Sequence, residues 1–481
     1  MAPDAIVDPT HPLTCTICDW NINGGHVEYE IECKRAFDET PWRVVRRYRE
    51  FDALHRQLRS FGAPLRLPPK YVFGCTKERV VKARLSELQG YLNALTVSPV
   101  LYASPHVVAF LTAEAYADRG AHPANTTGPL LYVRNAFLTA VRNRHQWTLC
   151  SMWENVGWRY NKGFASVRLS GGASRKEPMH LVSWMPLGID HCREVGIEDM
   201  EMLLQVIRDI KSPYISDAGE AWADRRGVGL VAPIYDGTLR DHLYKSRADE
   251  AFLLKYGFDR QVYSLERVDV CFIGRQVLEA LQILHSIPVP FVNVHCGNVL
   301  VTDMGCEILD VEFALCGQPS LYRAAMIRST SVNTLEDMMV FAFGELIYEL
   351  ITGFIVFPDH TPEQAIALCP APFHDLLKSV FQPQVSNGLP SLEELTKTPL
   401  FANVPVVRMS KKEISIPGRA KRLLDKLTLN IEKRLQEEQI QFSKIRKLEE
   451  WQQFINSEEQ RTIRKKIVQA EQLKMTKNAN S

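Results

Sequence analysis

The sequence lacks an uncharged hydrophobic run long enough for a membrane-spanning helix. Its longest apolar stretch, residues 338–357, contains Glu345 and Glu349 on one helical face, which argues against a span. The first residues, MAPDAIVDPTHPL, combine neither a basic start nor an apolar core, so we expect no secretory signal peptide. Any contact with a membrane is therefore expected to be peripheral.

Neither the cysteines nor the net charge indicates a disulfide framework or a polyanionic partner. The eleven cysteines are scattered over 481 residues, and such an irregular, odd-numbered set is typical of a reducing cytosol. Cys15 and Cys18 form a C-x-x-C with no second pair nearby, so no metal site is predicted there. The formal net charge is only +1, and we expect no nucleic-acid partner.

The chain is long enough for several domains, because one hydrophobic core rarely exceeds roughly 250–300 residues. Residues 12–118 begin with three strand-like runs followed by amphipathic helices, which predicts an α+β module. Residues 119–145 include RGAHPANTTGP and are predicted to be a linker. In residues 146–405 short strand-like segments precede a mainly helical half, and residues 406–481 have helical apolar spacing and an excess of Lys and Arg. We therefore predict an α+β multidomain protein with a basic amphipathic helical tail.

The hexapeptide RRYREF, residues 46–51, stands where a predicted strand leads into a predicted helix. A guanidinium group can bind a phosphate through two parallel hydrogen bonds, and an aromatic ring can support a sugar-like ring. Together with PPK at 68–70 and RLSELQGYL at 84–92, this hexapeptide resembles the PX domain. That family binds phosphatidylinositol 3-phosphate on endosomal membranes and has a three-stranded antiparallel sheet with helices.

Matching the motifs position by position implies a lipid site and a membrane-insertion loop. The lipid site would consist of Arg47 for the 3-phosphate, Tyr48 for stacking on the inositol ring, Lys70 for the 1-phosphate and Arg84 for the 4- and 5-hydroxyl groups. The loop would present Tyr71, Val72 and Phe73 to the lipid interface, helped by nearby basic residues.

Four segments of residues 146–405 resemble parts of a two-lobed protein kinase. They are DGTLRDHLYK at 236–245, FIGRQVLEALQILHS at 272–286, FVNVHCGNVLVTDMGCEILDVEF at 291–313 and FGELIYELITG at 343–353. They correspond to the segment after the lobe hinge, the helix before the catalytic loop, that loop with its metal-binding triplet, and the helix that anchors the loop. The resemblance implies a kinase-like fold, whereas catalysis depends on particular side chains.

Most side chains that transfer phosphate are missing from this pattern. A kinase catalytic loop carries an Asp five residues before its Asn, and Asn293 takes that place before Asn298. Because an amide is a poor proton acceptor, we predict no catalytic residue. Glu312 replaces the glycine of the D-F-G triplet, which begins here at Asp310. Asn298 and Asp310 remain as a candidate pair for magnesium and nucleotide.

The small-lobe segments also depart from the kinase pattern. GWRYNKGF at 157–164 has two glycines but not the G-x-G-x-x-G of a phosphate-covering loop. MHLVSWMPLG at 179–188 places Ser183 and Trp184 where a strand lysine is expected. We predict that Trp184 fills the nucleotide pocket.

Other nearby residues do not restore the pattern. Glu201 is the expected glutamate of the small-lobe helix, and it would have no lysine partner. Lys162 and Lys176 are close in sequence but not at the expected strand position. His295 and Cys296 fit a structural role, because small-molecule kinases carry a similar H-x-x-N spacing.

The order of the two regions resembles the PX-domain-containing protein kinase-like family. LVSWMPLGIDHCREV, VHCGNVLV, NTLEDMMVFAFGELIYE and IEKRLQEEQ carry this likeness in order. The resemblance implies a poor or inactive kinase associated with endosomal sorting of membrane receptors and with ion-transport proteins, including sodium/potassium ATPase β-subunits. It also implies a cytoplasmic protein held peripherally on endosomal membranes, with the plasma membrane as a second location.

Two functions from different classes stay open. The first is a phosphoinositide-binding scaffold with a catalytically degraded kinase domain, which requires no cofactor. The second is a weak or atypical ATP-dependent serine/threonine kinase, in which Asn298 and Asp310 hold magnesium for ATP. The tail has two interpretations as well. It is either a solvated helix, or an amphipathic helix that pairs with another helix or an anionic surface.

Overall fold

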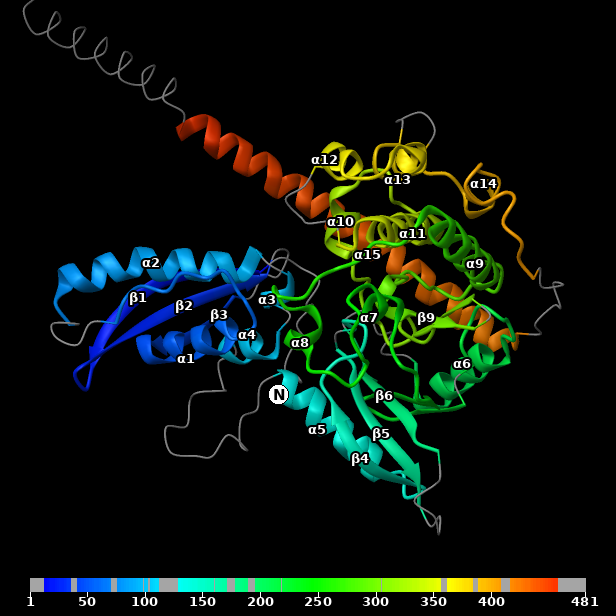
Figure 1. Ribbon diagram of the computed structural model, residues 1–481, viewed down its shortest axis with the longest axis horizontal. Helices are drawn as coiled ribbons and strands as arrows, with labels where there is room; N and C mark the ends of the chain where they lie inside the picture. Colours follow the sequence, from blue (N-terminus) through cyan, green and yellow to red (C-terminus); the bar gives the residue numbers. More distant parts are fainter. Residues whose placement is uncertain are drawn as a thin grey trace, which may run out of the picture.

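The protein consists of an N-terminal module, a two-lobed kinase-like domain and a long C-terminal helix (Figure 1). The computed structural model describes residues 13–35, 41–70, 76–97, 99–102, 104–111, 129–159, 161–170, 178–188, 195–217, 219–303, 305–355, 361–383, 388–407 and 416–456. Within these ranges no helix is both long enough and apolar enough to span a bilayer.

A three-stranded antiparallel sheet and four helices form the N-terminal module, residues 13–111. Its elements are β1 Leu13–Asn23, β2 His26–Arg35, β3 Trp42–Arg47, α1 Tyr48–Arg59, α2 Glu78–Val97, α3 Pro99–Tyr102 and α4 Pro105–Phe110, with the strands adjacent in chain order. Gly24 and Gly25 close the β1–β2 hairpin at φ of +57° and +78°, a conformation that suits glycine. In the core, the Phe51 ring centroid lies 4.9 Å from that of Phe110. The predicted α+β module is confirmed.

The small lobe of the kinase-like domain is a five-stranded antiparallel sheet with two helices. Its elements are α5 Pro129–Arg142, β4 Trp147–Trp153, β5 Gly163–Leu169, β6 His180–Pro186, α6 Ile197–Asp209, β7 Glu220–Ala223 and β8 Gly227–Pro233, and the strand order is β4-β5-β6-β8-β7. Phe137 and Val141 of α5 belong to one buried cluster with Val182 of β6. Residues 129–142, predicted as part of a linker over 119–145, therefore form a helix that covers this sheet.

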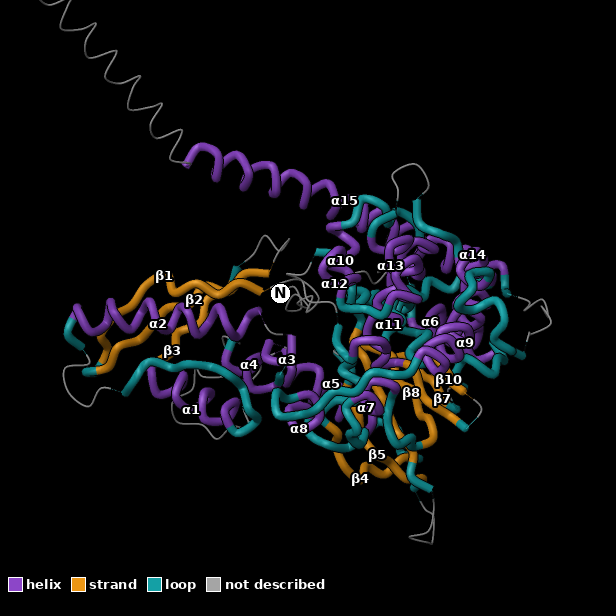
Figure 2. The backbone as a smooth tube through the Cα atoms, turned by 45° about the horizontal axis from the view of Figure 1, so that its top comes forward, coloured by secondary structure: helices purple, strands orange, loops and turns teal. Residues whose placement is uncertain are grey.

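The large lobe is mainly helical and is built around α11. Its elements are α7 Leu239–Leu243, α8 Phe252–Tyr256, α9 Arg267–Ser286, β9 Val299–Thr302, β10 Gly305–Ile308, α10 Arg323–Arg328, α11 Leu335–Thr352, α12 Pro362–Ala367, α13 His374–Phe381 and α14 Leu392–Thr396, with 3-10 turns at Cys296–Asn298 and Ala371–Phe373. Thr334 and Asp337 form a capping box for α11, and Gly353 ends it at φ +80°. Figure 2 shows α9 to α14 above the small-lobe strands, with α7 and α8 beside these strands. The predicted two-lobed fold is confirmed.

The C-terminal helix α15, Gly418–Asn456, is one continuous helix of 39 residues. Its first half lies against the kinase-like domain and its second half extends away from it (Figure 1). The buried apolar positions are Ala420, Leu424, Leu427, Ile431 and Leu435. The interpretation of this segment as a solvated helix is therefore wrong for its first half, because an apolar stripe is buried against the lobes.

The N-terminal module touches the large lobe at a glycine. Gly62 has φ +77°, and a Cβ built there would lie 2.0 Å from Oδ1 of Asp259. A Cβ built on Gly257 would lie 3.3 Å from the carbonyl oxygen of Phe61. The two backbones therefore approach each other with no space for a side chain at Gly62, and one buried apolar cluster includes residues of both bodies.

Candidate functional site

The two arginines at the end of β3 point in opposite directions. Arg46 is only 1% exposed, and its Nε donates to the carbonyl oxygen of Phe110 at 2.7 Å. Arg47 is half-buried and precedes α1. Its backbone N–H donates to Oε2 of Glu50 at 2.5 Å, which caps the helix. Because side chains alternate along a strand, burial of Arg46 leaves Arg47 on the face that a ligand can reach.

Arg84 and Tyr48 form a stacked pair beside Arg47. The guanidinium carbon of Arg84 lies 4.3 Å from the centroid of the Tyr48 ring, a cation–π contact. Arg84 Nη2 donates to the carbonyl oxygen of Pro69 at 3.3 Å, and the Tyr48 hydroxyl donates to that of Pro68 at 2.5 Å. These bonds hold the segment that ends in the exposed residue Lys70. Two of the four predicted lipid-site residues, Tyr48 and Arg84, are thus in contact, and Arg47 and Lys70 are next in sequence to Tyr48 and Pro69. The role of the four residues in lipid binding stays a prediction.

The predicted insertion residues Tyr71, Val72 and Phe73 lie outside the described residues. Their proposed role in the lipid interface stays a prediction.

In the kinase-like domain, the polar side chains of the catalytic-loop segment bind the loop itself. Asn293 Oδ1 accepts from the backbone N–H of Leu321 at 2.7 Å. Asn298 Nδ2 donates to the carbonyl oxygen of Asn293 at 2.6 Å, and its Oδ1 accepts from the N–H of His295 at 2.9 Å. Asn293 therefore holds the chain that follows the metal-binding triplet, and both polar atoms of Asn298 are already engaged.

His295 is a buried structural residue, as its sequence context indicates. Its Nδ1 accepts from the backbone N–H of Gly297 at 3.0 Å. Burial, together with the nearby charge of Arg240, lowers the pKa of His295 well below its ordinary value of 6.5. The imidazole is therefore neutral, and it serves as a hydrogen-bond acceptor within the loop.

Two basic residues of the loop 157–164 occupy the metal end of the cleft. Lys162 Nζ lies 2.5 Å from Oδ1 of Asp310 and 2.9 Å from Oε1 of Glu312. Arg159 Nη1 lies 3.0 Å from the same Asp310 oxygen. All four side chains are at most 3% exposed. They form a buried cluster of two cations and two carboxylates, which we call the cleft cluster.

Charge pairing decides the ionisation of the cleft cluster. Burial alone would raise the pKa of Asp310, but Arg159 and Lys162 outweigh it, so the net pKa is lowered from 3.8. Burial alone would lower the pKa of Lys162, but Asp310 and Glu312 outweigh it, so the net pKa is raised from 10.5. Asp310 and Lys162 are therefore both charged at neutral pH.

These residues do not fit a magnesium–nucleotide complex. Asp310 already binds two cations through Oδ1, and only its Oδ2 has no hydrogen-bond partner among the described residues. The amide oxygen and nitrogen of Asn298 both form hydrogen bonds within the loop. A divalent cation here would face two buried positive side chains at short range, which is strongly unfavourable at low dielectric. The predicted magnesium pair is therefore not arranged as a metal site.

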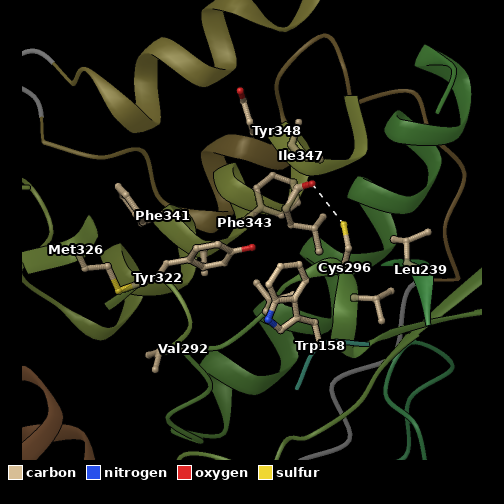
Figure 3. Packing of buried hydrophobic residues seen from close by; sticks show 14 of the residues in the cluster. Trp158, Leu239, Val292, Cys296, Tyr322, Met326, Phe341, Phe343, Ile347 and Tyr348 are labelled. Carbon is tan, nitrogen blue, oxygen red and sulfur yellow. Dashed lines mark hydrogen bonds between the residues drawn. The ribbon is translucent and has the colours of Figure 1, made fainter. Parts of the chain in front are cut away.

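The loop that carries Arg159 also closes the cleft by direct packing. Gly157 has φ +69°, and a Cβ there would lie 2.0 Å from the carbonyl oxygen of Gly297. Arg240 Nη1 donates to the carbonyl oxygen of Gly157 at 2.9 Å. The next side chain, Trp158, stacks on Tyr256 with a centroid distance of 5.4 Å. Figure 3 shows Trp158 among large-lobe core residues.

Two predictions about this cleft were wrong. Trp184 does not fill the nucleotide pocket, because it packs with Val182 and α5 on one face of the sheet, while Leu181 packs with Phe164 on the other. Glu201 is exposed on α6, and it therefore does not take the place of the buried helix glutamate. The space at the metal end is filled by Arg159 and Lys162 instead.

Sequence reasoning missed Arg159 and set Lys162 aside because it is not inside a strand. One signal could have found them. The loop GWRYNKGF carries two cations where phosphate-binding loops rely on backbone amides, and the triplet DVE at 310–312 carries two carboxylates. Such complementary charges are consistent with direct pairing of the two segments.

The N-terminal module has the α+β fold and the sequence motifs of a PX domain. It is joined to a kinase-like domain whose cleft is filled by its own side chains. These two features define a PX-plus-kinase-like class of protein. Comparison with known proteins supports this class. The PX domain family matches residues 34–114. A Mus musculus protein named PX domain-containing protein kinase-like protein is 31% identical over 454 residues, which cover 93% of this chain and 75% of that protein. The chain belongs to the family of PX domain-containing protein kinase-like proteins.

Two other relatives are similar to a part of this chain. Slowpoke-binding protein of Drosophila melanogaster is 28% identical over 282 residues, covering 52% of this chain and 51% of that protein. A Dictyostelium discoideum protein named probable inactive serine/threonine-protein kinase slob2 is 31% identical over 188 residues, covering 37% of this chain and 32% of that protein.

Proposed function

We propose that this protein is a phosphoinositide-binding scaffold whose kinase-like domain binds other proteins and does not transfer phosphate. The observation that carries the proposal is a contrast between two sites. In the PX domain, Arg84 stacks on Tyr48, both bind the backbone of residues 68–69, and Arg47 and Lys70 are next in sequence to these contacts. The kinase-like cleft, in contrast, has its phosphate end filled by the cleft cluster.

The proposed ligand is phosphatidylinositol 3-phosphate in a membrane. Arg47 would bind the 3-phosphate and Lys70 the 1-phosphate, because both are basic and neither is deeply buried. Arg84 and Tyr48 would bind the inositol ring and its hydroxyl groups. The protein would then be cytoplasmic and peripheral on endosomal membranes, with the plasma membrane as a second location.

The proposed kinase-like domain requires neither magnesium nor ATP. Asn293 offers an amide in place of the catalytic carboxylate, and that amide already binds Leu321. Replacing a catalytic base typically costs roughly 10²–10⁴ in rate. No observation in the described residues favours the alternative of a weak serine/threonine kinase.

The proposed protein partners are membrane receptors or ion-transport proteins, with sodium/potassium ATPase β-subunits as one candidate. Support comes from the name of the Drosophila melanogaster relative, Slowpoke-binding protein. A scaffold of this kind would hold its partner at the membrane that the PX domain selects.

The test is flotation of the purified full chain with vesicles that contain phosphatidylinositol 3-phosphate. We expect the parent and Arg49→Ala to float and Arg47→Ala to stay in the bottom fraction. Arg49 is the matched control because it is an exposed arginine in the same hexapeptide. Equal flotation of Arg47→Ala and the parent would overturn the proposed lipid site.

A further inference from the structure

We propose that α15 is a built-in brace that joins α6 of the small lobe to α10 and α11 of the large lobe and holds the lobes together without nucleotide. The brace is independent of lipid binding and goes beyond the proposed function. The brace fixes the position of α6 relative to the large lobe.

The start of α15 binds α6. Ala420, Leu424 and Leu427 share a buried apolar cluster with Met200 and Leu203 of α6. At the rim, Arg419 Nε lies 2.6 Å from Oδ1 of Asp199, and Arg419 Nη2 lies 2.9 Å from Oδ2. An arginine that contacts both oxygens of one carboxylate fixes orientation as well as distance.

The middle of α15 binds the backbone of the large lobe between the end of α10 and the first turn of α11. Glu432 Oε1 accepts from the backbone N–H of Leu335 at 2.8 Å, at the first turn of α11. Gln439 Nε2 donates to the carbonyl oxygens of Met326, Ser329 and Val332 at 3.3, 2.9 and 2.8 Å. Helix ends leave backbone groups without intrahelical partners, and α15 binds such groups at the start of α11 and at the end of α10 and in the segment between the two helices.

A buried charge fixes the position of α15 along the large lobe. Glu438 is 7% exposed. Its Oε2 lies 2.8 Å from Nε of Arg323, and its Oε1 lies 3.0 Å from Nε of Arg434. A buried carboxylate tolerates little displacement from its cations, because separation would leave a charge in a medium of low dielectric. The contact is therefore specific in register.

The brace holds α6 in place of an ion pair that active protein kinases use for this helix. In active protein kinases a strand lysine and a helix glutamate tie the small-lobe helix to the cleft. Here the strand position carries Ser183, and Glu201 of α6 is exposed. Contacts from α15 reach α6 from outside the cleft instead, through Asp199 and the apolar cluster. The lobes are thus coupled by this helix in addition to the cleft cluster.

Amide hydrogen exchange of the full chain, followed peptide by peptide, tests the brace. Leu424→Asp places a charge at a residue 1% exposed, and Leu429→Asp is its control on the same helix, at 62% exposed. We expect exchange in α6 to become roughly tenfold faster in Leu424→Asp and to stay unchanged in Leu429→Asp. Exchange in α2 of the PX domain should not change in either variant.

A milder variant keeps the test decisive if Leu424→Asp does not fold. Arg419→Glu reverses the charge that faces Asp199 at a side chain that is 64% exposed, and Arg422→Glu is its exposed control. Faster exchange of α6 in Arg419→Glu alone supports the brace. Unchanged exchange of α6 in Arg419→Glu, with α15 itself exchanging faster, overturns it, because α15 would then be attached without holding α6.

Discussion

Lys162 and Asp310 form an ion pair of 2.5 Å across the kinase-like cleft, although 148 residues separate them in the chain. Arg159 and Glu312 complete the pair into a buried group of two basic and two acidic side chains. The cations of this group stand where a kinase would place magnesium and the phosphates of ATP. The cleft is therefore filled by residues that the chain itself supplies.

Magnesium and ATP should not stabilise the protein. A ligand present at one hundred times its Kd adds about 2.7 kcal/mol of stability, which corresponds to a shift in Tm of several degrees for a domain of this size. We expect no measurable shift of the full chain at millimolar ATP with magnesium, measured by differential scanning fluorimetry. A clear upward shift would show that the cleft cluster opens for nucleotide.

Removing the central cation should destabilise the kinase-like domain strongly. Lys162→Met leaves Glu312 buried without its Lys162 pair and leaves Asp310 with only Arg159, so we expect a loss of about 3–5 kcal/mol in the free energy of unfolding. The measurement is urea denaturation, followed through a spectroscopic signal that comes from the kinase-like domain. Lys211→Met is the control, because Lys211 forms a surface ion pair with Asp217 and should change stability by less than about 1 kcal/mol.

The double variant Lys162→Met/Glu312→Met separates pairing from packing. Removing one charge of each sign should restore part of the lost stability, since a buried ion pair can often be replaced by apolar side chains of similar volume. A double variant less stable than Lys162→Met would show that Glu312 contributes through contacts other than Lys162.

Substitution of two neighbouring arginines of the PX domain should affect different properties, stability for Arg46 and vesicle binding for Arg47. Arg46→Ala removes the bond to Phe110 and empties a buried site, so we expect a loss of about 2–4 kcal/mol of stability. Arg47→Ala should change stability by less than about 1 kcal/mol and abolish vesicle binding. Thermal denaturation and flotation on the same samples check this. Loss of binding in Arg47→Ala with equal loss of stability would contradict a ligand role.

Acidification should weaken the fold through His295. Its folded pKa lies well below 6.5, so the unfolded chain binds the proton first as the pH falls, and stability present above pH 6.5 is lost. Arg240, Arg159 and Asp310 are the charged groups that act on this imidazole. Between pH 7.5 and 5.5 we expect the parent to lose about 1.4 kcal/mol more than His295→Asn.

The comparison for His295→Asn is the difference between two urea titrations, so other titrating groups cancel. Asparagine can still accept from the N–H of Gly297, and this keeps the loop closed. Equal pH dependence in both proteins would show that another group is responsible.

The sequence was sufficient for features that depend on local pattern. RRYREF predicts the strand-to-helix transition at Arg47 and Tyr48 because turn, cap and apolar spacing all lie within one short segment. The two-lobed fold follows similarly from long periodic helices such as α11. The catalytic-loop changes at Asn293 and Glu312 are visible as single letters at fixed spacing.

Features that depend on long-range pairing or on strand parity could not be predicted in the same way. Neighbouring strand residues face opposite sides of a sheet, so a placement uncertain by one residue sends Trp184 to the wrong face. Lys162 was dismissed because it precedes β5, whereas its role comes from a contact with the distant residue Asp310. Contacts of α15 with Asp199 and Arg323 likewise join segments more than a hundred residues apart.

The pairing within the cleft cluster would have a physiological consequence for the proposed scaffold. Arg159 and Lys162 pair with Asp310 and Glu312 inside the protein, so the proposed scaffold would keep the same cleft contacts with and without ATP and magnesium. Such a scaffold would not respond to the energy state of the cell. Its occupancy at a membrane would then follow the lipids and the protein partners that this membrane offers.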